Sequence, residues 1–178
     1  MTQSNHRPSV NAYFEPRYNI NADNQLYLGI AGNSISFPNR AAAEVLTRFE
    51  VHALTDVTGF GLLGHLRNVT AASGVTAEVW ADRVPVLDAA REYVKAGIAP
   101  GGTRANAKFL ADWVQFAPNV SPEEHLLLCD AQTSGGLLAA VPGAVAGEVV
   151  KALTEAGTLA SAVVGRITGE GAGKIRVV

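Results

Sequence analysis

The chain has one cysteine, almost no excess of either charge, and no long apolar run. Cys129 alone excludes an internal disulfide and fits a reducing compartment, so we expect a cytoplasmic protein. A formal net charge of −2 offers no basic surface for nucleic acid or for an anionic membrane. Glycine, proline or charge interrupts every apolar stretch, and the polar first ten residues lack a secretory core. We therefore expect neither a membrane span nor a signal peptide.

What is present suits one domain, or one domain with an extension. The chain has 178 residues, and 48% of them are hydrophobic, which is enough for a sizeable core. Residues 1–37 differ from the rest, because they hold six asparagines and three of the four tyrosines and show no helical period. Only residues 25–32, QLYLGIAG, resemble a strand. The composition predicts an extension over residues 1–37 and a domain over 38–178.

From residue 38 onward, helical and strand patterns alternate. Helices are expected over residues 38–49, 61–74, 84–97, 121–130 and 144–157. Strands are expected over residues 51–57, 75–81, 135–142, 160–169 and 174–178. Strands that alternate with helices predict an α/β layered domain.

Several side chains define the expected helix faces and ends. In the helix over 61–74, Leu62, Leu63, Leu66 and Val69 share one face, and Gly74 is the expected C-cap. In the helix over 144–157, the inward-facing residues are expected to be Val145, Val149, Ala152, Leu153 and Ala156. Ser121 is the expected N-cap of the helix that follows it.

The segment TDVTGFGLLGHL, residues 55–66, is the first candidate site. Gly59, Gly61 and Gly64 surround the expected start of a helix, whose N–H groups and positive end favour an approaching phosphate. Asp56 would repel that phosphate unless a cation lay between them, and Mg²⁺ is commonly held by carboxylates and phosphates together. The alternative is that Asp56 caps the helix while the glycines permit tight packing.

Two further glycine-rich segments are weaker candidates. In DAQTSGGLLAAV, residues 130–141, small residues permit close approach of a ligand or neighbouring domain, or form a tight turn. In GIAPGGTRAN, residues 97–106, Thr103 is the expected N-cap, and Arg104 would meet an anion or simply lie on a surface helix. Cys129 is expected to be a small buried hydrophobe, and the histidines are too scattered for a metal pair.

Several motifs in fixed order carry a family resemblance. They are NRAAAEVL, HALTDVTGFGLLGHL, AGIAPGGTRAN, DAQTSGGLLAAVP and VVGRITGEGAGKIRVV. From Pro38 to Val178, the chain resembles the C-terminal half of selenophosphate synthetase (selenide, water dikinase). The wider superfamily includes aminoimidazole ribonucleotide synthetase, thiamine-monophosphate kinase and a hydrogenase-maturation enzyme. The resemblance implies a layered domain in which helices pack on a mixed sheet.

The resemblance also implies a reaction and a site. Selenide, ATP and water would yield selenophosphate, AMP and phosphate, with Mg²⁺ held partly by Asp56. Thr58, Gly59, Phe60 and Gly61 would contact the nucleotide, and no catalytic side chain is expected in this chain. An N-terminal half or a homodimer partner would complete the site.

The departure from the family is equally informative. In that family the remaining metal-binding aspartates and the reactive cysteine with its lysine lie in the N-terminal half, whereas residues 1–37 contain neither Cys nor Lys. We therefore expect the chain alone to be inactive. The alternatives are a non-catalytic interaction module and the matching domain of a related ATP-binding enzyme.

Overall fold

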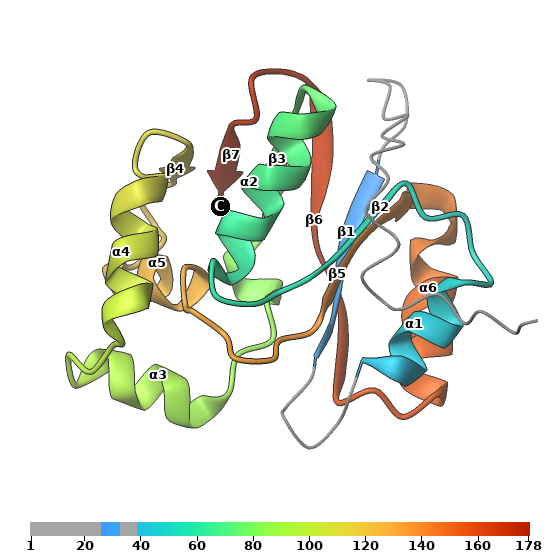
Figure 1. The fold of residues 1–178 in the computed structure, drawn as a ribbon, viewed down its shortest axis with the longest axis horizontal. Coiled ribbons are helices and arrows are strands. Elements are labelled where there is room, and N and C mark those ends of the chain that lie inside the picture. Colours follow the sequence, from blue (N-terminus) through green and yellow to red (C-terminus); the bar gives the residue numbers. More distant parts are fainter. Residues whose placement is uncertain (1–25, 33–38) are drawn as a thin grey trace, which may run out of the picture.

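The computed structural model describes residues 26–32 and 39–178, which form an alternating series of strands and helices (Figure 1). The strands are β1 (Leu26–Gly32), β2 (Ala53–Asp56), β3 (Val75–Val79), β4 (Val114–Phe116), β5 (Leu137–Pro142), β6 (Ala160–Glu170) and β7 (Ile175–Val177). The α-helices are α1 (Arg40–Leu46), α2 (Gly61–Ser73), α3 (Asp88–Lys95), α4 (Gly101–Leu110), α5 (Pro122–Leu128) and α6 (Ala146–Glu155). The 3-10 turns are η2 (Ala81–Arg83) and η3 (Gly143–Val145).

The strands of the described residues form one mixed sheet, in the order β2-β5-β1-β6-β3-β7-β4. Strand β7 pairs in parallel with β3 and β4, and the other neighbouring pairs are antiparallel. The α/β architecture with a mixed sheet is therefore confirmed.

Strand β1 lies inside the sheet, between β5 and β6. The strand expected over residues 25–32 is confirmed for residues 26–32. This part of the expected extension is consequently a component of the domain's own sheet. Residues 1–25 and 33–38 lie outside the described ranges, so the proposed division after residue 37 stays a prediction for them.

Helices cover both faces of the sheet, and β5 shows how. Its residues Leu137, Ala139 and Val141 belong to one apolar cluster, together with residues of α1 and α6. Leu138 and Ala140 belong to a second cluster, which includes the buried side of α2. Because alternate strand residues point to opposite faces, the two clusters lie on opposite sides of the sheet. Burial on both faces explains the continuous apolar run of β5.

Helix α2 confirms its sequence pattern. Leu62, Leu63, Leu66 and Val69 are all buried. The helix ends at Gly74, whose left-handed backbone (φ 65°) forms the C-cap, as expected. Ser121 likewise caps α5 in a reciprocal capping box with Glu124.

Other helix details were predicted incorrectly. The first helix is shorter than residues 38–49, because α1 begins at Arg40 and ends at Leu46. Ala156 is exposed and lies beyond the end of α6. Helix α4 begins at Gly101 with Pro100 at the N-cap, so Thr103 lies inside the helix. Its hydroxyl donates to Asp130 in another segment instead of capping its own helix.

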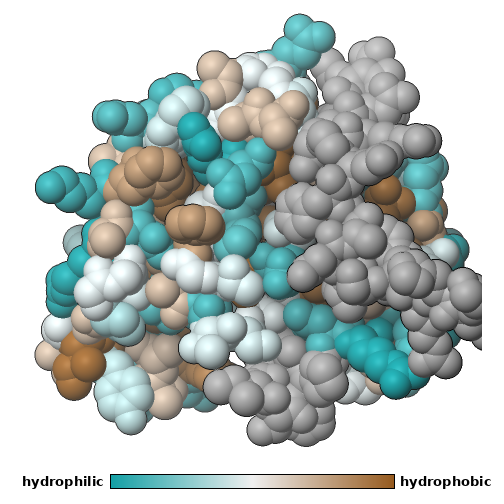
Figure 2. Space-filling model, viewed as in Figure 1, coloured by the Kyte–Doolittle hydropathy of each residue, from teal (hydrophilic) through white to brown (hydrophobic). Residues whose placement is uncertain are grey.

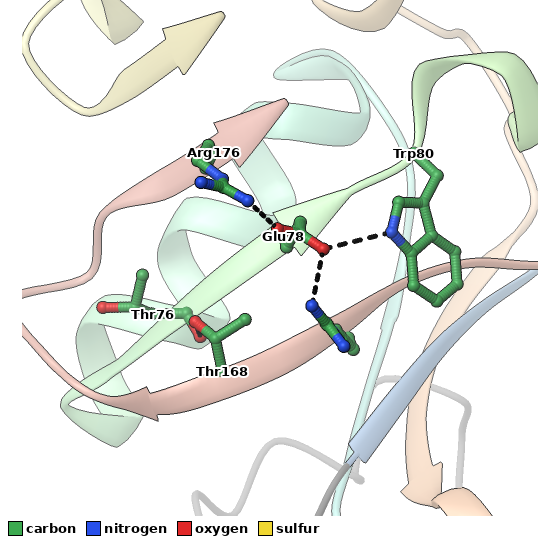
Figure 3. A network of polar contacts seen from close by, with 6 residues as sticks. Thr76, Glu78, Trp80, Thr168 and Arg176 are labelled. Atoms are coloured by element: carbon green, nitrogen blue, oxygen red, sulfur yellow. Dashed lines mark hydrogen bonds and ion pairs between the residues drawn. The ribbon is translucent and has the colours of Figure 1, made fainter. Parts of the chain in front are cut away.

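A buried carboxylate neutralised by arginines lies on β3 (Figure 3). Glu78 points away from the apolar cluster that receives Ala77 and Val79. Its Oε1 accepts a 3.2 Å hydrogen bond from the Trp80 indole and lies 3.1 Å from Arg166 Nη2. Its Oε2 accepts from Arg176. The cluster thus ties β3 to β6 and β7 on this face of the sheet.

The molecular surface in Figure 2 mixes hydrophobic and hydrophilic residues over the half of the molecule that contains α3 and α4. The brown hydrophobic groups there are small and are separated by teal and white ones. Among the described residues, no helix has the length and apolar character needed to cross a bilayer.

Candidate functional site

The three glycine-rich segments, residues 55–66, 97–106 and 130–141, are joined by hydrogen bonds around residues 57–59, which follow β2. Val57 and the Gly135–Gly136 pair exchange hydrogen bonds: Val57 N–H donates to Gly136 O and Gly135 N–H donates to Val57 O, each at 2.9 Å. One residue further on, Thr58 O accepts from Gln132 N–H at 3.1 Å. Segments far apart in the sequence therefore form one loop cluster.

Asp56 is the last residue of β2, and it is exposed. Its carboxylate makes no hydrogen bond or ion pair with any described residue. The N-cap of α2 is Phe60, four residues later, and no side chain caps this helix. The geometry thus does not support the capping alternative, and it leaves the Asp56 carboxylate available to an external ligand.

Some of the backbone N–H groups after Asp56 are hydrogen-bonded within the domain, and others are free to bind a ligand. Thr58 N–H donates to His65, and Gly61 N–H closes a turn by donating to Thr58 O at 2.9 Å. Gly59 and Phe60 are exposed, and their N–H groups have no hydrogen-bond partner in the part of the chain that the structure describes. Of the four residues expected to contact the nucleotide, Gly59 and Phe60 therefore have amides free to bind an anion.

Gly61 and Gly135 explain why the cluster needs glycine. Gly61 has a positive φ of 69°, and a Cβ there would lie 2.7 Å from the carbonyl carbon and oxygen of Cys129. A Cβ at Gly135 would collide with the carbonyl oxygen of Val57. Both glycines therefore allow one backbone to approach another. The small residues of segment 130–141 therefore allow close approach of Val57, which follows β2 in the same domain.

His65 anchors the loop from within α2. Its Nε2 accepts the Thr58 N–H at 3.0 Å and lies 3.1 Å from the Thr58 hydroxyl. Burial lowers the pKa of His65, and the negative charge of Asp56 offsets part of that effect. A neutral imidazole is required, because Nε2 must keep a lone pair to accept the amide hydrogen. The sequence places His65 inside the helix expected over residues 61–74 as either a partly buried or a surface residue, and it gives no signal of this contact.

Side chains from α4 hold the same loops. Asn106 Nδ2 donates to Gly59 O at 2.9 Å and to Cys129 O at 3.1 Å. The buried Thr103 hydroxyl donates to Asp130 Oδ1 at 2.6 Å, and Gln132 donates to the other oxygen of that carboxylate at 2.7 Å. The sequence contained these residues within GGTRAN and DAQTSGG, but their pairing depends on how α4 packs.

Other chemical candidates are weaker. Arg104 is exposed, and its Nη2 donates to Gly97 O. Cys129 is buried as expected, and burial raises the pKa of its thiol to about 11, so the thiol stays protonated at neutral pH. Within the described ranges, no three His, Cys, Asp or Glu side chains gather closely enough to hold a metal ion. The described residues thus offer Asp56 beside free amides, but no complete ligand set for a metal ion.

The sequence matches the family described as AIR synthase related protein, C-terminal domain, over residues 9–178. The chain belongs to this family. The matched range includes β1 and every later element, and thus the whole sheet of this AIR synthase related domain.

Curated relatives of the domain are named selenide, water dikinase. The relative from Carboxydothermus hydrogenoformans is 43% identical over 139 residues, which cover 78% of this chain and 40% of the relative. The one from Pelobacter propionicus is 44% identical, over 74% of this chain and 38% of the relative. Selenide, water dikinase 2 from Peptoclostridium acidaminophilum is 42% identical, over 72% and 37%. The match spans only about two fifths of their length.

Solved structures support the fold. The E. coli hydrogenase maturation protein HypE has a TM-score of 0.64 at 17% identity, covering 90% of this chain and 48% of that one. HypE in complex with ATP has a TM-score of 0.60 at 18% identity, over 91% and 49%. Phosphoribosylformylglycinamidine synthase II from Thermotoga maritima has a TM-score of 0.52 at 13% identity, over 82% and 22%. At these identities the likeness concerns the fold alone.

Proposed function

We propose that this AIR synthase related domain is the C-terminal part of a selenide, water dikinase and supplies one wall of its Mg-ATP site. The observation that carries the proposal is the exposed, unpaired Asp56 beside the free amides of Gly59 and Phe60, at the N-terminal end of α2. The names of relatives more than 40% identical support the reaction class. The complete enzyme would convert selenide, ATP and water into selenophosphate, AMP and phosphate, in the cytoplasm.

Asp56 fits the role of one Mg²⁺ ligand. Mg²⁺ prefers oxygen ligands and commonly takes one or two carboxylates together with substrate phosphates and water. Bound there, Mg²⁺ would neutralise phosphate charge during transfer. Since no three His, Cys, Asp or Glu side chains of the described residues gather into a metal site, further protein ligands would have to come from elsewhere. An N-terminal half or a homodimer partner would supply them.

The residues after Asp56 would bind the nucleotide phosphates through the backbone. Gly59 and Phe60 are exposed residues whose N–H groups have no partner among the described residues, and the positive end of a 13-residue helix follows them. The family resemblance implies that Thr58 and Gly61 contact the nucleotide directly. Their amides would not do so, because both are already hydrogen-bonded within the domain. Their role would be to fix the turn that presents the two free amides.

The proposal is tested with a fusion protein. The full chain is joined to the part of the Carboxydothermus hydrogenoformans relative that it does not match, and AMP formation that depends on selenide is measured. We expect Asp56→Asn to lower this rate at limiting Mg²⁺ by at least about a hundredfold, because an uncharged amide replaces an anionic ligand. The unfolding free energy should change by less than about 0.5 kcal/mol, because Asp56 is exposed and unpaired.

Asp82→Asn is the matched control, since Asp82 is also exposed but lies in η2, outside the three glycine-rich segments. It should leave AMP formation unchanged. Full activity of Asp56→Asn at limiting Mg²⁺ would exclude the metal role. A fusion that consumes ATP without selenide would favour a related ATP-using enzyme, whereas a folded fusion that binds no nucleotide would favour a non-catalytic interaction module.

A further inference from the structure

We propose that Asn106 is a positioning residue that sets the direction of the Gly59–Phe60 peptide bond, so that the Phe60 N–H faces the phosphate. The inference rests on the proposed function of this loop. It adds a residue outside the loop, on α4, whose side chain would act through the backbone and would not touch the nucleotide.

The contacts of Asn106 connect two backbones. Its single amide nitrogen carries two hydrogens, and it donates to Gly59 O at 2.9 Å and to Cys129 O at 3.1 Å. The neighbouring Gly61 also lies directly against Cys129. Asn106 therefore fastens the loop where it is pressed most closely onto the segment before β5.

Because the peptide bond is planar, the contact of Asn106 with the Gly59 carbonyl also fixes the direction of the Phe60 N–H. Gly59 C=O and Phe60 N–H belong to one planar trans unit, in which the two groups point in opposite directions. Holding the carbonyl toward α4 therefore directs the Phe60 N–H away from α4. Phe60 is 59% exposed, and this N–H has no acceptor among the described residues.

The turn favours the same direction, because Gly61 N–H closes it onto Thr58 O and a flipped peptide would require a positive φ at Phe60, whose φ is −88°. The turn does not, however, hold the Gly59 carbonyl itself. The other anchors act on Thr58, through His65, Gln132 and the Gly61 turn. Within residues 26–32 and 39–178, the Asn106 side chain is the one hydrogen-bond donor to the Gly59 carbonyl.

The preceding turn of α4 holds Asn106 in place. Thr103, three residues earlier and therefore on the same side of the helix, is 1% exposed. Its hydroxyl donates to Asp130 at 2.6 Å and accepts from Ala131 N–H at 3.3 Å. These bonds fix α4 against residues 129–131, which keeps the Asn106 amide between its two carbonyl acceptors.

The first test needs no nucleotide. Residual dipolar couplings of backbone N–H groups are measured by NMR on the full chain, comparing Asn106→Leu with Asn68→Leu. Asn68 lines the same groove between α2 and α4, but its side chain is exposed and makes no hydrogen bond to a described residue. We expect the Phe60 coupling to change in Asn106→Leu and to stay the same in Asn68→Leu. An unchanged Phe60 coupling in Asn106→Leu would overturn the inference.

If Asn106→Leu does not fold, Asn106→Asp replaces it, because Asp keeps the side-chain shape and removes both donor hydrogens. The same change of the Phe60 coupling is expected. The couplings of the buried β5 amides serve as an internal reference, since a general loss of structure would move them as well.

The second test measures binding of Mg²⁺ with a non-hydrolysable ATP analogue to the fusion protein by calorimetry. We expect Asn106→Leu to raise the dissociation constant about tenfold, as for loss of a hydrogen bond to a charged group, and Asn68→Leu to leave it unchanged. Equal affinity in the Asn106→Leu fusion would refute the positioning role while leaving the proposed function intact. A parent fusion that binds the analogue but makes no AMP with selenide would instead refute the proposed function alone.

Discussion

At the scale of single residues, Gly61 is under two constraints at once. Its φ is 69°, and a Cβ would lie 2.7 Å from the backbone of Cys129. We expect Gly61→Ala to lower the unfolding free energy by about 2–4 kcal/mol, from left-handed strain together with overpacking against a backbone that cannot move aside cheaply. Denaturation with urea measures the loss.

Gly59→Ala is the matched control for this prediction. Gly59 has no positive φ, and its Cβ position is open. The substitution should change the unfolding free energy by less than about 1 kcal/mol. Equal losses in the two variants would mean that the close approach of Gly61 to Cys129 does not exist in solution.

Glu78 gives a prediction about pH. Burial would raise the pKa of Glu78, but hydrogen bonds from Arg176 and Trp80 and the charges of Arg166 and Arg176 together hold that pKa below its ordinary value of 4.5. The ionised carboxylate therefore stabilises the fold above about pH 4.5, and this stabilisation is lost as the pH falls through the lowered pKa. Arg166 lies on β6 and Arg176 on β7, so protonation of Glu78 would weaken the attachment of these two strands to β3.

The measurement compares the unfolding free energy of the unchanged chain with that of Glu78→Gln as a function of pH. We expect the difference to be largest above about pH 4.5 and to shrink toward acid, because only the unchanged chain loses an ionised Glu78. The exposed Glu170 serves as the control position, and Glu170→Gln should give a curve parallel to that of the unchanged chain. A difference that does not vary with pH would contradict the ion-pair account.

At the scale of elements, α2 connects the core to the candidate site. Its first turn follows the free amides, and Leu66, two turns from Phe60, is fully buried. We expect Leu66→Ala to cost about 2–5 kcal/mol of unfolding free energy, because it leaves a cavity beneath the helix. The control is Leu87→Ala. Because Leu87 is 72% exposed, this substitution should lower the unfolding free energy far less. An unchanged denaturation midpoint for Leu66→Ala would mean that the helix packs with another face.

The helix ends show which element-level features sequence determines. The Ser121 cap of α5 was predictable, because both partners of the capping box lie within three residues of each other. The start of α4 was predicted wrongly, because Thr103 has the chemistry of a cap but its hydroxyl bonds to Asp130, 27 residues away. Asp56 likewise looked like a possible cap, yet α2 begins five residues later, at Gly61, and no side chain caps it.

At the scale of the whole molecule, the site is one-sided. Asp56 is the one metal ligand that we assign to it, no three His, Cys, Asp or Glu side chains gather within the described residues, and the curated relatives are more than twice as long as the matched region. We expect the chain alone to form no AMP from ATP and selenide, because one carboxylate cannot hold Mg²⁺ and a triphosphate in near-octahedral geometry. Chromatographic detection of AMP from the chain alone, with the fusion protein as positive control, checks this. If the chain alone and the fusion protein formed AMP at similar rates, the residues supplied by the fused part would be unnecessary for the reaction.

The sequence by itself determined the α/β class, most elements, the buried face of α2 and the placement of Asp56 at the end of a strand before a glycine-rich helix start. These features follow from periodicity, cap chemistry and turn residues, which act over a few positions. The tertiary structure decided the place of β1 inside the sheet, the meeting of three glycine-rich segments, and which amides remain free. Those outcomes depend on hydrogen bonds such as that between Asn106 and Gly59, 47 residues apart, and local pattern carries no information about a partner at that distance.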